Sequence, residues 1–210
     1  EAQQAFEGLV KGWCRDPGAR IDLVDALTRV EALERPVDPA EIRGILDRMA
    51  RQTREAGPRV EDRIRAINAL LFDSLRFESL TQAQVRDEFY LSEVLRRRAG
   101  NCVGLSSLYW ALGDLTELPL YGARAPGHYC LIAEPLGGRR IVEPTAKGGS
   151  PTEEEVFRQM GPVTRRQQDR NRYLRPLSRH TLVAEVLNSQ AGRFAEQNRL
   201  AEALRNFDWA

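Results

Sequence analysis

The chain has 210 residues, of which 42% are hydrophobic and 29% are charged, a composition typical of a folded globular protein and not of a disordered one. Its 31 basic and 30 acidic residues nearly cancel, so the overall charge gives no indication of nucleic-acid binding. No apolar run approaches the length of about 18 residues that a membrane-spanning helix needs.

The first part of the chain is predicted to be helical. Residues 1–57 read as a helical segment that packs on the core, with Asp38-Pro39 as a helix start and a Gly-Pro pair as its end. A second helix is predicted over residues 60–71, where apolar residues recur on one face. It carries Asn68, for which a surface or locally bonded amide is the simplest role. A short helix at 91–98 then leads into a glycine-rich loop.

The pattern changes after the next helix. Strands are predicted at 118–124, 128–133 and 140–143, with hairpin-turn residues at 136–139. Helices followed by a small antiparallel sheet predict an α+β fold.

Side chains alternate along a strand, so His128, Cys130 and Ile132 are predicted to share one face of this sheet. If the register of the returning strand is right, Glu143 lies beside His128 on that face.

Residues 178–210 are predicted to form a helical hairpin. Six of them fall where a tetratricopeptide repeat places its packing residues: Leu187, Ala191, Phe194, Ala203, Phe207 and Ala210. We therefore expect the start of such a repeat, which would continue beyond Ala210 and could bind a protein partner. The alternative is an ordinary amphipathic hairpin that closes the domain. The arginine clusters at 96–98 and 165–166 are interpreted as solvated helix faces.

The three cysteines, Cys14, Cys102 and Cys130, are an odd number and lack the short spacing of a metal-binding motif. They argue against a disulfide framework and against a zinc site. The sequence does not decide whether Cys102 and Cys130 form a single disulfide. We expect no metal and no cofactor. The chain begins at Glu1 and not at a methionine, so the location stays unknown: cytoplasmic, or exported after loss of a leader.

The stretch Gly100-Asn101-Cys102-Val103-Gly104 is predicted to place Cys102 on the first turn of a helix. A thiol there lies at the positive end of the helix dipole, which favours the nucleophilic thiolate. His128, after Pro126-Gly127, and Glu143, before Pro144, follow along the chain. This is the order of a nucleophile, its base and the group that orients the base.

Each of these residues also has a structural interpretation. Cys102 could be a small buried hydrophobic residue, His128 a structural residue at the end of a strand, and Glu143 a surface carboxylate. Cys14 and Cys130 are interpreted as structural.

Several of these stretches together resemble a known family. They are Ile67-Asn68-Ala69-Leu70-Leu71-Phe72, the run from Arg98 to Tyr109, Leu118-Pro119-Leu120-Tyr121-Gly122, Ala125-Pro126-Gly127-His128 and Ile141-Val142-Glu143-Pro144-Thr145. Over residues 60–150 the chain is similar to the bacterial transglutaminase-like domain of the SirB type. The resemblance implies a papain-like α+β core with Cys102 as nucleophile, His128 as base and Glu143 as third member. The family more often has aspartate at that third position, many of its members lack the cysteine, and tetratricopeptide repeats often follow the domain.

The leading prediction is a transglutaminase-like domain at 58–177, between the helical segment at 1–57 and the hairpin at 178–210. It would transfer the acyl group of a peptide or protein amide through a Cys-His-Glu triad, to water or to an amine. The Cys102 backbone N–H is a natural oxyanion donor, with Asn101 and Asn68 as candidates for a second one. The rival is a catalytically inactive interaction module linked to a repeat scaffold. A third hypothesis is a helical structural protein in which Cys102 and His128 never meet.

Overall fold

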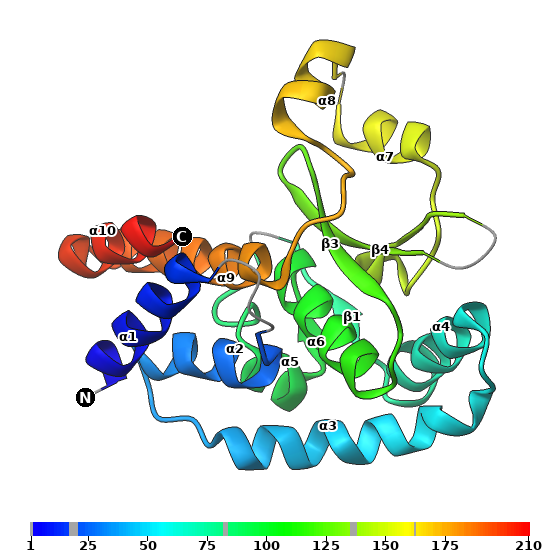
Figure 1. The fold of residues 1–210 in the computed structure, drawn as a ribbon, viewed down its shortest axis with the longest axis horizontal. Helices are drawn as coiled ribbons and strands as arrows, with labels where there is room; N and C mark the ends of the chain where they lie inside the picture. The colour runs from blue at the N-terminus through cyan, green and yellow to red at the C-terminus, as the bar shows by residue number, and fades with distance from the viewer. Residues whose placement is uncertain (1, 17–20, 82–83, 135–137, 162) are drawn as a thin grey trace.

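The computed structural model describes residues 2–16, 21–81, 84–134, 138–161 and 163–210. The described residues form helices and two small sheets, which confirms the α+β class (Figure 1). The helices up to the middle of the chain are α1 (Ala2–Arg15), α2 (Leu23–Ala32), α3 (Pro39–Thr53), α4 (Val60–Asn68), α5 (Leu91–Arg97) and α6 (Cys102–Leu115), with a 3₁₀ turn at Arg54–Ala56 and a π-helical turn at Ala69–Ser74.

The later elements are more mixed. They are the strands β3 (Leu120–Ala125), β4 (His128–Ala133) and β5 (Arg140–Val142), a 3₁₀ turn at Pro144–Ala146, and the helices α7 (Glu153–Met160), α8 (Arg165–Asn171), α9 (Arg179–Glu196) and α10 (Leu200–Trp209). Two short parallel strands, β1 (Glu78–Ser79) and β2 (Ala99–Gly100), form the second sheet. Within the ranges that the structure describes, none of the helices combines the length and apolar character that a membrane span requires.

The three-stranded sheet is antiparallel in the order β3-β4-β5. Its first strand begins two residues later and ends one residue later than predicted, and the predicted turn at 136–139 lies partly outside the described residues. Leu131 pairs with Val142, so the same register carries Glu143 to the position opposite Cys130. Opposite residues share a face, and Glu143 therefore lies on the face that also carries His128.

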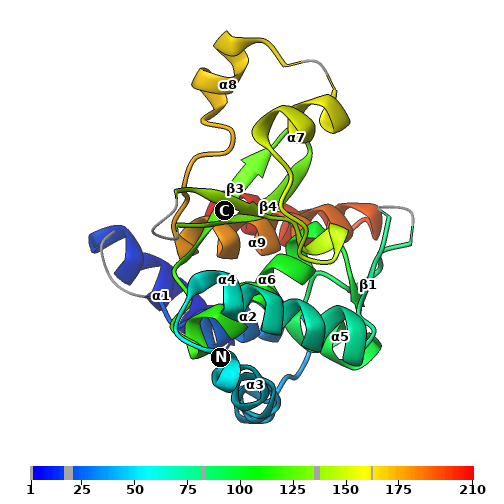
Figure 2. The same ribbon diagram turned by 90° about the vertical axis from the view of Figure 1, so that its right-hand side faces the viewer.

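Helix α6 is the central element of the core. It lies between the three-stranded sheet and α3, as Figures 1 and 2 show from two sides. Eleven consecutive residues, 103–113, are buried, including Tyr109 and Trp110. A helix that is apolar all round is stable only when neighbours cover every side of it. The sheet, α3, α5 and α9 cover α6 in this way, and its N-terminus is therefore held in place.

The C-terminal hairpin of α9 and α10 is joined to the rest of the chain by buried polar contacts. Gln190 Nε2 donates to the Val30 carbonyl at 3.1 Å and to Tyr90 Oη at 2.6 Å, and its Oε1 accepts a hydrogen bond from Asn206 Nδ2. Side chains from all three predicted segments also share one hydrophobic core. The division of the chain at residues 57 and 177 stays a prediction.

Four of the predicted packing residues of the hairpin are buried: Leu187, Ala191, Phe194 and Ala203. Phe207 is 50% exposed, and it lies on α10 with the exposed Leu200 and Leu204. The structure therefore shows a helical hairpin with one apolar face open. The tetratricopeptide repeat itself stays a prediction.

The position of α6 depends on a close approach at Gly104. An alanine Cβ there would lie 2.3 Å from the Glu88 carbonyl oxygen and 2.7 Å from Val94 Cγ2. Because that oxygen belongs to the backbone, Gly104→Ala should lower the free energy of unfolding by about 1–3 kcal/mol in denaturant titrations. In Gly12→Ala the new Cβ meets nothing within 4 Å, so α1 should be unaffected or stabilised by up to about 1 kcal/mol. Equal losses in the two variants would contradict this account.

Candidate active site

Cys102 is the first residue of α6 and is half-buried. Asn101 caps the helix, since its Oδ1 accepts a hydrogen bond from the Gly104 N–H at 2.8 Å. Immediately before it, β2 pairs with β1, so the backbone is held on both sides of the cysteine. This agrees with the predicted placement of the thiol at a helix N-terminus.

His128 begins β4 and contacts Glu143, which follows β5. The distance from His128 Nε2 to Glu143 Oε2 is 2.6 Å, and only 11% and 9% of the two side chains are exposed. The second carboxylate oxygen, Oε1, accepts hydrogen bonds from the backbone N–H of Thr145 at 3.0 Å and from its hydroxyl at 2.5 Å. Glu143 thus contacts the ring through Nε2 while its other oxygen is held by Thr145.

Cys102 is the other side chain that affects the ring, and the two residues line the same cavity. Burial lowers the pKa of His128, but hydrogen bonds to Cys102 and Glu143, together with the charges of these two groups, outweigh it and raise the pKa to about 10. The ring therefore holds its proton at neutral pH, between a sulfur and a carboxylate. The structure brings together the three residues that the sequence singled out in the order Cys, His, Glu.

The other two cysteines differ from Cys102. Cys130 is fully buried, and burial, reinforced by the charges of Glu143 and Cys102, raises the pKa of its thiol. Cys14 is exposed on α1. All three cysteines are free thiols, so no Cys102–Cys130 disulfide is present.

A cavity of about 450 Å³ lies beside Cys102 and His128. Its other walls include Arg124 and Tyr173. A second cavity of about 630 Å³ shares Asn101 and Ser189 with the first. The two cavities therefore adjoin each other at Asn101 and Ser189.

The two asparagine candidates have different surroundings. Asn101 lines the cavity next to Cys102. Asn68 is not among the lining residues: its Nδ2 donates to the Gly148 carbonyl at 3.1 Å, and its Oδ1 accepts from Tyr109 Oη at 2.8 Å. Its partners are distant in sequence, so the amide is neither a surface group nor locally bonded. Asn68 instead holds the loop behind Glu143, where Gly148 has a φ of +72° and a Cβ would lie 1.8 Å from the amide oxygen.

Sequence reasoning assigned no role to Thr145, although a signal was there. Glu143 acts as the N-cap of a 3₁₀ turn with Pro144 in its first position, and an acid followed by proline is a known start signal. The cavity residues Arg124 and Tyr173 had no such signal, because only folding brings them to Cys102. Among the described residues, no group of three or more His, Cys, Asp or Glu side chains is arranged to hold a metal ion.

An α+β core with a cysteine at the start of its central helix, facing a histidine on the sheet, defines a papain-like class of protein. A family model described as the transglutaminase-like superfamily matches residues 40–188. The match covers more than half of the chain, and the protein belongs to the transglutaminase-like superfamily. This membership confirms the resemblance at the level of the superfamily and supports cysteine acyl transfer as the class of function.

Two curated relatives are known from Xylella fastidiosa, both called UPF0162 protein. The one from strain 9a5c is 26% identical over 154 residues, and the one from strain Temecula1 / ATCC 700964 is 25% identical over 154 residues. In both cases the match covers 68% of this chain and 53% of the relative, so the chain spans about half the length of these proteins. No solved structure matches the chain significantly.

The two histidines should titrate on opposite sides of the ordinary value of 6.5. His180 packs edge-on against Trp13, with 5.6 Å between the ring centroids, and burial lowers its pKa. His128 should keep its proton until the pH rises through about 10. Imidazole ¹H–¹⁵N NMR spectra recorded across pH measure both. Glu143→Gln removes the neighbouring charge, and it should lower the pKa of His128 and leave that of His180 unchanged. A His128 that titrates below His180 would refute the assigned environment.

Proposed function

We propose that this protein is a cysteine acyl-transfer enzyme that acts on an amide bond of a peptide or protein. The observation that supports it most is the position of His128, which lies beside Cys102 in one cavity and contacts Glu143 through Nε2. In this proposal Cys102 is the nucleophile, His128 is the base, and Glu143 is the residue that positions the base.

The reaction proceeds in two halves. In the resting site the proton of Cys102 already lies on His128, and the sulfur attacks the amide carbonyl carbon to form a tetrahedral intermediate. Its oxyanion accepts a hydrogen bond from the Cys102 backbone N–H, with the Asn101 side chain as the second donor. His128 then gives the proton to the leaving amine, and a thioester on Cys102 remains. Water or a second amine, activated by His128, attacks the thioester and regenerates the thiol.

Glutamate can serve as the third member because both of its carboxylate oxygens are held. Oε2 contacts His128, and Oε1 is bonded to Thr145. A carboxylate fixed at one oxygen can orient the imidazole through the other and stabilise the imidazolium that forms during the reaction.

The alternative function is a non-catalytic module that binds a protein partner. The exposed apolar residues Leu200, Leu204 and Phe207 on α10 favour such a contact. Because α10 contributes no residue to the Cys102 cavity, a thiol-reactivity test separates the two functions.

Iodoacetamide should alkylate Cys102 at pH 6, because the neighbouring imidazole accepts the proton of the thiol. Peptide mass spectrometry should find the label on Cys102, and Cys102→Ser should remove both this label and all turnover of amide substrates. Cys14→Ser is the matched control: the exposed Cys14 has no proposed role, so its loss should leave labelling of Cys102 unchanged. If Cys102 stays unlabelled at pH 6 while Cys14 reacts, the enzymatic proposal is wrong.

Glu143→Gln should slow the alkylation of Cys102 at pH 6 by about a hundredfold, because His128 loses its orienting charge. Thr145→Val keeps the backbone N–H bond to Oε1 and removes only the hydroxyl bond, so its effect should be about tenfold or less. Alkylation rates followed by mass spectrometry measure both variants without a known substrate. Equal rates in wild type and Glu143→Gln would exclude the positioning role.

A further inference from the structure

Positive charge is concentrated in one segment beside the candidate site. Residues 165–175 contain a single acid, Asp169, and five arginines: Arg165, Arg166, Arg170, Arg172 and Arg175. The chain as a whole has a formal net charge of only +1, so the remaining residues together are net negative. All five arginines are exposed. Arg165 contacts Asp169 at 3.4 Å, and the other four form no ion pair with any residue that the structure describes.

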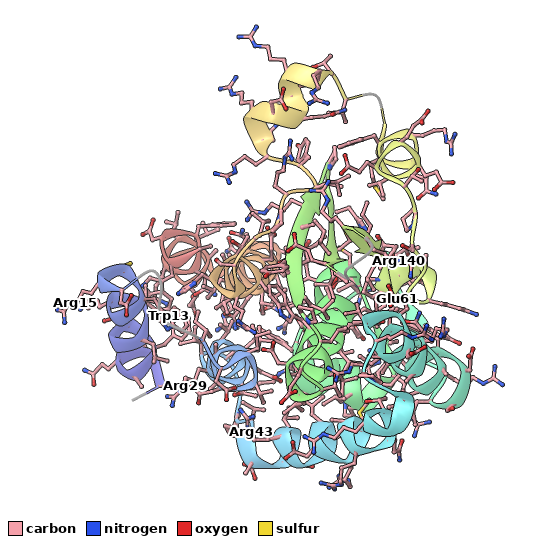
Figure 3. All side chains as sticks on the ribbon, turned by 45° about the vertical axis from the view of Figure 1, so that its right-hand side comes forward. Trp13, Arg15, Arg29, Arg43, Glu61 and Arg140 are labelled. Carbon is pink, nitrogen blue, oxygen red and sulfur yellow. The ribbon has the colours of Figure 1, made fainter. Side chains whose placement is uncertain are left out.

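Packing does not explain this segment. Helix α8 has no buried residue, and a helix as short as this one has little stability of its own. It is held by a capping box, in which Thr164 and Gln167 exchange hydrogen bonds, and by the buried Leu174 that follows it. Figure 1 shows α8 at the end of the molecule beyond the sheet, and in Figure 3 its side chains project outward. The arginines are therefore displayed to solvent.

The same segment forms part of the wall of the Cys102 cavity. Asn171 and Tyr173 line that cavity together with Cys102 and His128. The chain then follows β3, where the Leu174 N–H donates to the Arg124 carbonyl at 2.8 Å. Arg170 and Arg172 are the chain neighbours of Asn171, so the arginine-rich segment adjoins the wall of the cavity.

We propose that residues 165–175, the arginine surface, bind an acidic segment of a protein substrate and so bring a neighbouring carboxamide to Cys102. This inference rests on the proposed function and specifies its substrate class. Guanidinium groups bind carboxylates through paired, charge-assisted hydrogen bonds, and several exposed arginines in series suit a run of aspartates or glutamates.

An acidic peptide fits this surface better than a nucleic acid does. Single-stranded nucleic acids bind to surfaces on which exposed aromatic rings stack with the bases. The one aromatic residue of the arginine surface is Tyr173, which is half-buried with its ring 6.5 Å from that of Phe157. The cavity beside the arginine surface also contains the thiol of Cys102, which attacks an amide in the proposed function. An acidic protein supplies both the amide and the negative charges that the arginines would bind.

The binding test uses the full chain with Cys102→Ser, so that no chemistry interferes, and a fluorescein-labelled polyglutamate peptide. Fluorescence anisotropy at low salt should show binding that Arg166→Glu/Arg170→Glu weakens about tenfold or more, since exposed ion pairs are individually weak but add up in series. High salt should abolish it. The matched control is Arg48→Glu/Arg51→Glu, which makes the same charge change at two exposed arginines of α3 that form no ion pair with the residues described. Figure 3 shows this helix, marked by Arg43, at the opposite end of the molecule from α8.

The control variant should change the affinity for the peptide by less than about twofold, because charges this far from the surface are screened. An equal loss in the two double variants would overturn the proposal. So would a single-stranded RNA oligonucleotide of equal charge that binds more tightly than the peptide and loses affinity in the Arg166→Glu/Arg170→Glu variant.

A second measurement connects the surface to the site. In a Cys14→Ser protein that keeps Cys102, bound polyglutamate should slow the alkylation of Cys102 by iodoacetamide, and Arg166→Glu/Arg170→Glu should remove this protection. Binding without protection would overturn the link to the cavity. The outcomes also separate this inference from the proposed function: an unreactive Cys102 refutes the enzyme and leaves the anisotropy result intact. A reactive Cys102 with no arginine-dependent binding refutes this inference alone.

Discussion

The burial of α6 on every side is the constraint on which the rest of the structure depends. Its eleven consecutive buried residues leave no polar face, so the helix can exist only where the sheet, α3, α5 and α9 enclose it. This enclosure fixes the position of the helix N-terminus. The cap at Asn101 then holds the first turn, which carries Cys102. The close approach of Gly104 to the Glu88 backbone shows how little room is left there.

The positions of His128 and Glu143 are fixed by strand pairing and by the turn that follows it. The antiparallel register of β4 and β5 places Glu143 opposite Cys130 and one step from His128 on the same face. The 3₁₀ turn after Glu143 then bonds its second oxygen, and Asn68 holds the loop that follows. A site in a protein works when its groups are held by a rigid surrounding structure, and here a buried helix and a paired strand meet at one point.

The parts of the chain outside this core divide into those that pack and those that do not. The C-terminal hairpin is tied to α2 and to the segment before α5 through the buried amide of Gln190. This amide takes part in three hydrogen bonds, and buried bonds of this kind make one arrangement of helices more favourable than others. Helix α8 has no such contacts, and its arginines are displayed beside the cavity. The superfamily match, which runs from α3 into α9, spans both the packed helices and this exposed segment.

Local chemistry in the sequence determined the elements of this protein. The glycines around Cys102 marked a helix start and an apolar period marked α6. Alternation placed His128 on one face of its strand, with Glu143 beside it on condition of the right register. These signals act over a few residues, and they were enough for the α+β class and for the order Cys, His, Glu. Tertiary structure alone decided that His128 lies beside Cys102 and contacts Glu143, that Asn68 supports a loop 80 residues away instead of lining the cavity, and that Arg124 and Tyr173 line the cavity with Cys102. Such contacts depend on how whole helices and strands pack. Packing brings together residues that are far apart in the sequence, and no short-range sequence pattern predicts such a contact.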